Sequence, residues 1–163
     1  NVNLLVEAVY RTVKQVDINC IFGVSPFGIW KNGDGSESGS LSRGTESYSA
    51  LYCDTIAWIK GGYVDYIAPQ LYWTNETASA PYDKLCDWWS DRVVNTKVRL
   101  LISHGAYRYE DGWQDPEGIM TSQIQYASQK NGYTGSLFYG YKAIADNIHD
   151  LLNELSQFYN SKE

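Results

Sequence analysis

The sequence predicts an α/β protein built from four parallel βα units. Apolar runs typical of buried strands occupy residues 20–24, 64–73, 97–103 and 135–139. Segments with helical spacing of apolar residues alternate with these runs, and one more precedes them at residues 1–15. Because strands and helices alternate along the chain, we expect parallel strands that are joined by right-handed crossovers.

The first helix and the first strand are identified by their apolar residues. The spacing in residues 1–15 predicts an inner helix face, which consists of Leu4, Leu5, Ala8, Val9 and Val13. The apolar run at 20–24 is closed by a Ser-Pro-Phe-Gly segment, as expected for a buried strand followed by a break. The Gly- and Ser-rich stretch 32–47 is long for a loop in a compact domain, so we expect it to be either functional or disordered.

Glycine and proline delimit the later helices. The helix at 48–60 should stop at a Gly-Gly pair, and a proline at position 81 opens a helix whose buried face is marked by Trp88 and Trp89. Asp115 is the expected N-cap of a helix that begins at position 116 and ends at an Asn-Gly pair. The last helix, at 143–159, has an apolar side that consists of Ile144, Ile148, Leu151, Leu152 and Leu155.

The length of the chain limits how complete this fold is. A full (β/α)8 barrel takes about 250 residues, so a chain of 163 residues fits four units and their loops. We therefore expect residues 1–163 to form a single fragment, which is half of a TIM-type barrel.

Composition excludes several classes of partner. The net charge of -6 and the pI of about 4.9 disfavour nucleic acids and anionic membranes, since both favour a basic patch. We see no apolar stretch of the roughly 20 residues that a membrane span needs, and no signal peptide. Cys20, Cys53 and Cys86 lie far apart without a C-x-x-C pair, so we expect neither a metal site nor a cofactor.

The candidate site follows from the predicted topology, because barrels of this kind hold their sites at the C-terminal ends of the strands. Aromatic rings with one dry face and one hydrogen-bonding edge gather there, as carbohydrate sites require. The candidate binding residues are Ser25, Trp30, Gln70, Tyr72, Trp73, His104, Tyr107 and Tyr139, and Arg108 follows the same strand as His104. The alternatives are packing beneath helices for Trp30, Trp73, Tyr107 and Tyr139, a structural role in the core for His104, and a loop amide without a function for Gln70.

Carboxylates are missing from these strand ends. Glycoside hydrolysis normally needs two carboxylates that flank the scissile bond. The acids that remain are in loops, where most charges are simply solvated: Asp34, Glu37, Glu76, Glu110 and Asp111. The sequence therefore leaves the catalytic residues unassigned.

Several segments together resemble the bacterial glycosyl-hydrolase-like family 10. The segments that carry the resemblance are residues 22–30, 47–48, 51–55, 64–73 and 103–105. The resemblance implies a (β/α)8 barrel among cell-envelope glycan hydrolases, with this chain similar to the C-terminal half and with an extracytoplasmic location. It also implies that an acidic strand-end motif lies upstream of Asn1. The positions that match cleft-lining ones are Ser25, Trp30, Gln70, Tyr72, Trp73 and His104.

The leading hypothesis is therefore a part of a glycoside hydrolase that supplies substrate-binding strand ends for an oligosaccharide or glycan. The alternative is a carbohydrate-binding module without catalysis, which has the same aromatic residues and needs no carboxylates. A third possibility is a homodimer in which two half-barrels pair their open edges, since unpaired strand edges favour association.

Overall fold

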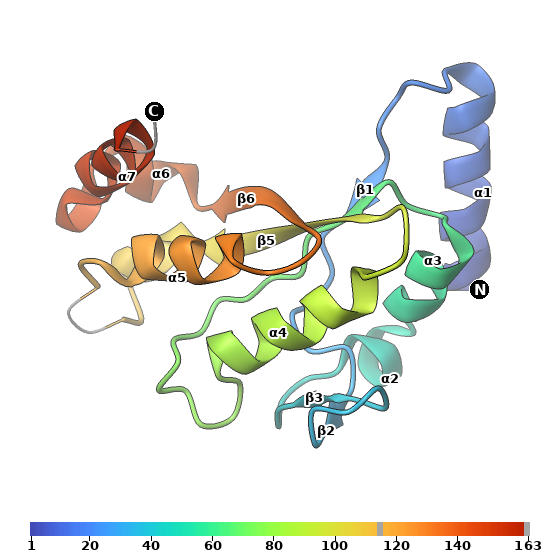
Figure 1. Ribbon diagram of the computed structural model, residues 1–163, viewed down its shortest axis with the longest axis horizontal. Helices are drawn as coiled ribbons and strands as arrows, with labels where there is room; N and C mark the ends of the chain where they lie inside the picture. The colour runs from blue at the N-terminus through green and yellow to red at the C-terminus, as the bar shows by residue number, and fades with distance from the viewer. Residues whose placement is uncertain (114–115, 162–163) are drawn as a thin grey trace.

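The fold is organised around a parallel β-sheet of four strands (Figure 1). The computed structural model describes residues 1–113 and 116–161. The sheet has the order β1 (Gly23–Val24), β4 (Tyr66–Ile67), β5 (Arg99–Gly105) and β6 (Tyr133–Tyr139), and all neighbouring strands run parallel. This arrangement confirms the predicted α/β class and is consistent with half of a TIM-type barrel.

Helices connect and cover the strands. α4 (Tyr82–Val93) packs against β5, and α5 (Ile119–Ser128) packs against both α4 and β6. The shorter elements η1 (Ala106–Tyr109), α6 (Tyr141–Ala145) and η2 (Ile148–Asp150) lead to the C-terminal helix α7 (Leu151–Asn160), which lies against α5. Among the described residues, β1 and β6 each pair with one neighbour, so association of two copies through these edges stays a prediction.

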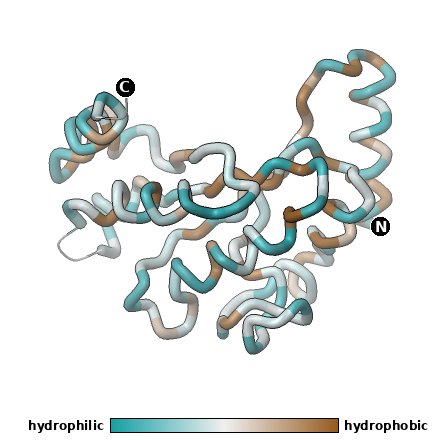
Figure 2. The backbone as a smooth tube through the Cα atoms, in the orientation of Figure 1, coloured by the Kyte–Doolittle hydropathy of each residue, from teal (hydrophilic) through white to brown (hydrophobic). Residues whose placement is uncertain are grey.

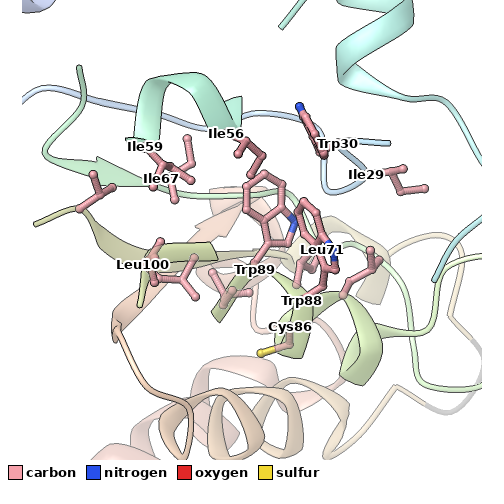
Figure 3. Close-up of a cluster of buried hydrophobic side chains, with 14 of the residues drawn as sticks. Ile29, Trp30, Ile56, Ile59, Ile67, Leu71, Cys86, Trp88, Trp89 and Leu100 are labelled. Atoms are coloured by element: carbon pink, nitrogen blue, oxygen red, sulfur yellow. The ribbon is translucent and has the colours of Figure 1, made fainter. Parts of the chain in front are cut away.

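Tryptophan side chains dominate the main core, which lies between the sheet and α4. Hydrophobic residues gather along the central strands (Figure 2), and Figure 3 shows Trp88 and Trp89 beside Leu71 and Trp30. Trp88 and Trp89 are 2% and 0% exposed, which confirms their predicted role in the core. The Trp89 indole also donates to the carbonyl of Gly28 at 2.7 Å, so α4 is fixed to the chain that follows β1.

The first helix differs from the prediction in how it packs. α1 (Val2–Val16) forms as expected, but Leu4 and Leu5 are 67% and 62% exposed, and among its residues only Val6 is buried. The helix contacts α3 (Thr55–Gly61) on another face, where Asn3 Oδ1 accepts a hydrogen bond from the Trp58 indole at 2.7 Å. The predicted inner face of α1 is therefore mostly exposed to solvent.

The helix predicted at 48–60 is two helices. α2 (Ser47–Leu51) ends at Tyr52, whose φ of 54° places it in the left-handed region. α3 then begins after Asp54, whose side chain accepts from the Ala57 N–H as an N-cap. Its end at Gly61 agrees with the predicted stop.

The helix predicted at 143–159 is also interrupted. Asn147, His149 and Asp150 all have positive φ, which separates α6 from α7. Asn147 tolerates this conformation better than most residues, and its side-chain oxygen accepts from the Leu152 N–H at 2.8 Å. A local hydrogen bond therefore stabilises the break between the two helices, and the apolar spacing of the sequence does not reveal it.

Two further predictions concern loops. The Gly- and Ser-rich stretch is ordered, since it forms the small parallel pair β2 (Asn32–Gly33) and β3 (Ser40–Leu41), and the Glu46 carboxylate accepts from the Asn32 N–H at 2.8 Å. The helix expected from position 116 begins at Ile119 after Gly118, and the predicted cap Asp115 lies outside the described residues.

His104 lies on the helix-facing side of β5 and has no exposed surface. Its ring is stacked between Tyr82 and Phe138, while Nδ1 and Nε2 lie 3.3 Å and 2.9 Å from Gln123 Oε1 and Ser136 Oγ. Burial lowers the pKa of His104 from its ordinary 6.5 to about 4, because the charged ring would lose its hydration. The imidazole is therefore neutral at physiological pH.

Replacement of Trp89 by Phe tests the core. The Trp89→Phe variant loses the indole donor to Gly28 and leaves unfilled volume, so the free energy of unfolding should fall by about 2 to 4 kcal/mol. Urea unfolding followed by far-UV circular dichroism measures the change. A Tyr52→Phe control, at a side chain that is 78% exposed, should change stability by less than about 0.5 kcal/mol. Equal stability of the two variants would contradict this account of the core.

His104 should make stability depend on pH in a defined window. Its pKa is lower in the folded state, so between pH 6.5 and about 4 the unfolded chain binds the proton more strongly. The neutral His104 ring makes its full contribution to the free energy of unfolding above pH 6.5. This contribution, about 3 kcal/mol in total, is lost as the pH falls from 6.5 to about 4.

Urea unfolding at several pH values checks this expectation with two variants. His104→Gln should flatten the slope between pH 6.5 and 4 relative to the wild-type protein. His149→Asn removes an exposed histidine at a positive φ that asparagine accepts, and it should keep the wild-type slope. An unchanged slope in His104→Gln would show that the buried ring does not control this dependence.

Candidate functional site

The C-terminal ends of the strands meet at one edge of the sheet. Beyond β1 and β4, parallel pairing continues through Phe27 and Gln70, and Gln70 is also bridged to Ser103 of β5. The Gln70 N–H donates to the Pro26 carbonyl at 3.0 Å, and Gly105 of β5 is paired with Tyr139 of β6. All four strand ends therefore present their residues to the same region, as the predicted topology requires.

Two adjoining cavities, of about 270 and 690 Å³, lie at this edge, and we call them together the strand-end cleft. The smaller cavity is lined by Phe27, Gly28, Thr45, Gln70, Tyr72, Trp73 and Arg108. The larger cavity is lined by Tyr72, Trp73, Thr74, Glu76, Thr77, Arg108, Gly112, Trp113 and Ile119. Tyr72, Trp73 and Arg108 line both, so they form the boundary between the two cavities.

Tyr72 is fixed by a cluster of three tyrosines. Its ring is stacked on Tyr139, with centroids 5.9 Å apart, and Tyr107 meets both rings edge-on. The Tyr72 hydroxyl lies 3.1 Å from Ser103 Oγ, and burial raises the pKa of this phenol, so it stays protonated. Tyr107 and Tyr139 do not line either cavity, and they act by packing against Tyr72.

Gln70 is oriented by the strand beside it. Its amide nitrogen donates to the Ser25 carbonyl at 3.1 Å, and Ser25 Oγ in turn donates to the Ala68 carbonyl at 2.8 Å. One side of the Gln70 amide is thus engaged with the protein. Its oxygen has no protein donor among the described contacts, which leaves an acceptor at the wall of the smaller cavity.

Trp73 is positioned through its backbone. Its carbonyl accepts from Gln123 Nε2 at 2.8 Å, and Gln123 Oε1 lies 3.3 Å from the His104 ring. The indole passes close to Gly28, where an added Cβ would lie only 2.8 Å from the ring and 2.4 Å from the Gln70 carbonyl. A glycine is therefore needed at position 28 for Trp73 to reach the cleft.

Of the eight predicted binding residues, three line the cleft (Gln70, Tyr72 and Trp73), three contact these residues without lining the cleft (Ser25, Tyr107 and Tyr139), and two lie elsewhere (Trp30 and His104). His104 faces the helices rather than the cleft, because adjacent residues of β5 point to opposite faces and Ser103 takes the cleft side. Trp30 is 8% exposed and is stacked on Trp88, with centroids 5.7 Å apart, in the main core (Figure 3). Neither side chain lines a cavity of the strand-end cleft.

The structure also adds residues that the sequence reasoning missed. Thr45 comes from the long Gly- and Ser-rich stretch, and Trp113 comes from the loop after η1. Glu76, one of the loop acids already named from the sequence, is the carboxylate among the described lining residues of the strand-end cleft. A third cavity, next to the start of α5, shares Glu76 with the larger one and adds Glu117. The length of the Gly- and Ser-rich stretch and the glycine at position 112 were the only sequence signals for Thr45 and Trp113.

No cluster of three or more potential metal ligands occurs among the described residues. Cys86 is buried, and burial raises the pKa of its thiol to about 12, so it is not a thiolate at neutral pH. Within residues 1–113 and 116–161, no helix combines the length and apolar character needed to cross a membrane.

Known proteins resemble the chain over about two thirds of its length or more. Glycosyl hydrolase YngK of Bacillus subtilis (strain 168) is 38% identical over 167 aligned residues, which cover 99% of this chain and 32% of the relative. Glycosyl hydrolase DigH of Escherichia coli (strain K12) is 41% identical over 108 residues, which cover 66% of this chain and 25% of the relative. The chain thus spans about a third or less of the length of these relatives.

The family comparison agrees with these relatives. The profile of the family described as glycosyl hydrolase-like 10 matches residues 1–117, which include β1, β4, β5 and most of the lining of the strand-end cleft. Since this match covers well over half of the chain, and the relatives are named glycosyl hydrolases, the chain belongs to the glycosyl hydrolase-like 10 family.

Proposed function

We propose that this chain supplies the substrate-binding strand ends of a glycoside hydrolase that acts on bacterial cell-envelope glycan. The observation that carries the proposal is the strand-end cleft, where Tyr72 and Trp73 stand between two adjoining cavities. Membership in a family of glycosyl hydrolases supports the reaction class. In this proposal the protein works outside the cytoplasm, where its substrate is.

Each of the three central groups suits a sugar. A sugar ring has apolar C–H faces and hydroxyl edges, so an aromatic side chain can cover the face while an amide contacts the edge. Trp73 and Tyr72 supply the aromatic surface, and the free Gln70 oxygen accepts from a hydroxyl. Because the two cavities adjoin across these residues, neighbouring sugar units of one glycan would occupy them.

The chemistry of bond cleavage needs carboxylates in addition. Glu76 lines the larger cavity, whereas hydrolysis of a glycosidic bond normally uses two carboxylic groups. We infer that the remaining acid belongs to a part of the enzyme outside residues 1–163, consistent with the greater length of the relatives. In this division of roles the chain binds and orients the glycan.

A carbohydrate-binding module without hydrolysis is the second candidate, and the presence of a single described carboxylate in the cleft favours it. Incubation of the intact protein with a cell-wall glycan separates the two functions. Release of new reducing ends supports the hydrolase, whereas saturable binding without such release supports the module.

Removal of the indole should weaken glycan binding. In the Trp73→Ala variant the cleft loses one of the two aromatic rings that line both of its cavities, so the dissociation constant for a soluble cell-wall glycan should rise by about 10-fold or more. Isothermal titration of the intact protein measures the change.

The matched control is Tyr52→Ala, which removes an aromatic ring that is 78% exposed and lies outside the cleft. This control should bind like the wild-type protein. If Trp73→Ala keeps wild-type affinity and a wild-type circular dichroism spectrum, the strand-end cleft is not the glycan site.

A further inference from the structure

Arg108 occupies a central place in the strand-end cleft. It lies in η1, directly after β5, and its half-buried side chain lines both cavities together with Tyr72 and Trp73. A glycan that extends from one cavity to the other would therefore pass its guanidinium group.

The charge of Arg108 is not neutralised by the described part of the protein. Its guanidinium forms no ion pair there, and its Nε is buried without a hydrogen-bond partner. Glu110, two residues away, is instead 3.5 Å from Lys142, and Glu76 lines the larger cavity without pairing with Arg108. A partly desolvated cation without a counter-ion costs free energy, which an anion in the cleft would recover.

The neighbours of Arg108 hold the side chain in place. Its guanidinium carbon lies 5.1 Å from the centre of the Tyr107 ring, at cation–π distance. On another side is Gly112, with a φ of 117°, where an added Cβ would lie 2.6 Å from Nη1. The group is therefore oriented before any ligand binds, and glycine at position 112 leaves the room that it needs.

We propose that the glycan bound in the strand-end cleft carries a carboxylate, and that Arg108 is the residue that selects it. The proposal rests on the proposed function and adds the chemical class of the substrate. A planar guanidinium binds a planar carboxylate through two parallel hydrogen bonds, a geometry that lysine cannot offer. Tyr72 and Trp73 line the same two cavities as Arg108, so the carboxylate is recognised as a substituent of a sugar rather than as a free ion.

A matched pair of glycans tests this selection. One is a soluble bacterial cell-wall glycan with free carboxylates, and the other is the same material with its carboxylates converted to methylamides. Titration of the intact wild-type protein should give at least about 10-fold tighter binding of the carboxylate form, because hydrogen bonds to charged groups are the stronger ones. A twofold rise in salt concentration should reduce this preference, whereas binding of the amide form should hardly change.

Three variants locate the selection at one residue. Arg108→Gln should bind both glycans with the affinity that the wild-type protein has for the amide form. Arg108→Lys keeps the charge but loses the paired geometry, so it should recover only part of the preference. Arg11→Gln removes an arginine that pairs with Glu7 on α1, far from the cleft lining, and should keep the full preference.

The outcomes separate this inference from the function on which it rests. Equal wild-type affinity for both glycans, or a full preference in a folded Arg108→Gln variant, would overturn the role of Arg108 and leave glycan binding intact. No wild-type binding of either glycan would overturn the proposed function, and the inference with it. If inorganic phosphate competed for the site as effectively as the carboxylate glycan, Arg108 would belong to a general anion site. That outcome would also contradict selection of a sugar carboxylate.

Discussion

The parallel pairing at Gln70 is the constraint on which the site depends. The Gln70 N–H donates to the Pro26 carbonyl, the Leu71 N–H donates to the Ser103 carbonyl, and the Ser103 N–H returns to Pro69. These bonds hold three chain segments in register just beyond β4, although proline at position 69 has no N–H to continue the ladder. Tyr72 and Trp73 leave the sheet from this point, so the same bonds determine where the cleft lies.

The elements of the fold were predictable where apolar spacing is long and regular. β5 and α4 lie within a few residues of their predicted ranges because each has several buried apolar residues in regular spacing, and β6 lies close to its predicted range although its residues are only partly buried. The breaks at Tyr52 and Asn147 were not predictable, since the apolar spacing continues across them and the chain turns through left-handed backbone held by local hydrogen bonds. The exposed side of α1 was missed for a related reason: periodicity shows that an apolar face exists but not what covers it.

The same limit decides which site residues were predictable. Gln70, Tyr72 and Trp73 follow a buried strand directly, and position along the chain was sufficient to place them in the cleft. For β5, alternate residues point to opposite faces of the sheet, so the site residues depend on which set faces the cleft. The sequence of a strand that is buried on both faces does not reveal which set that is. The structure resolves it: Ser103 contacts Tyr72, and the neighbouring His104 contacts the helices.

His104 nevertheless remains connected to the cleft through Gln123. The Gln123 amide lies between the buried imidazole and the Trp73 carbonyl. Its two contacts therefore connect the core beside the sheet to the wall of the cleft. Tyr72, Gln70 and Arg108 are each restrained in a comparable way by neighbours that do not themselves line both cavities. A cleft whose walls are ordered beforehand loses little side-chain entropy when a flexible glycan binds, and this saving favours binding of a ligand that offers few contacts per sugar unit.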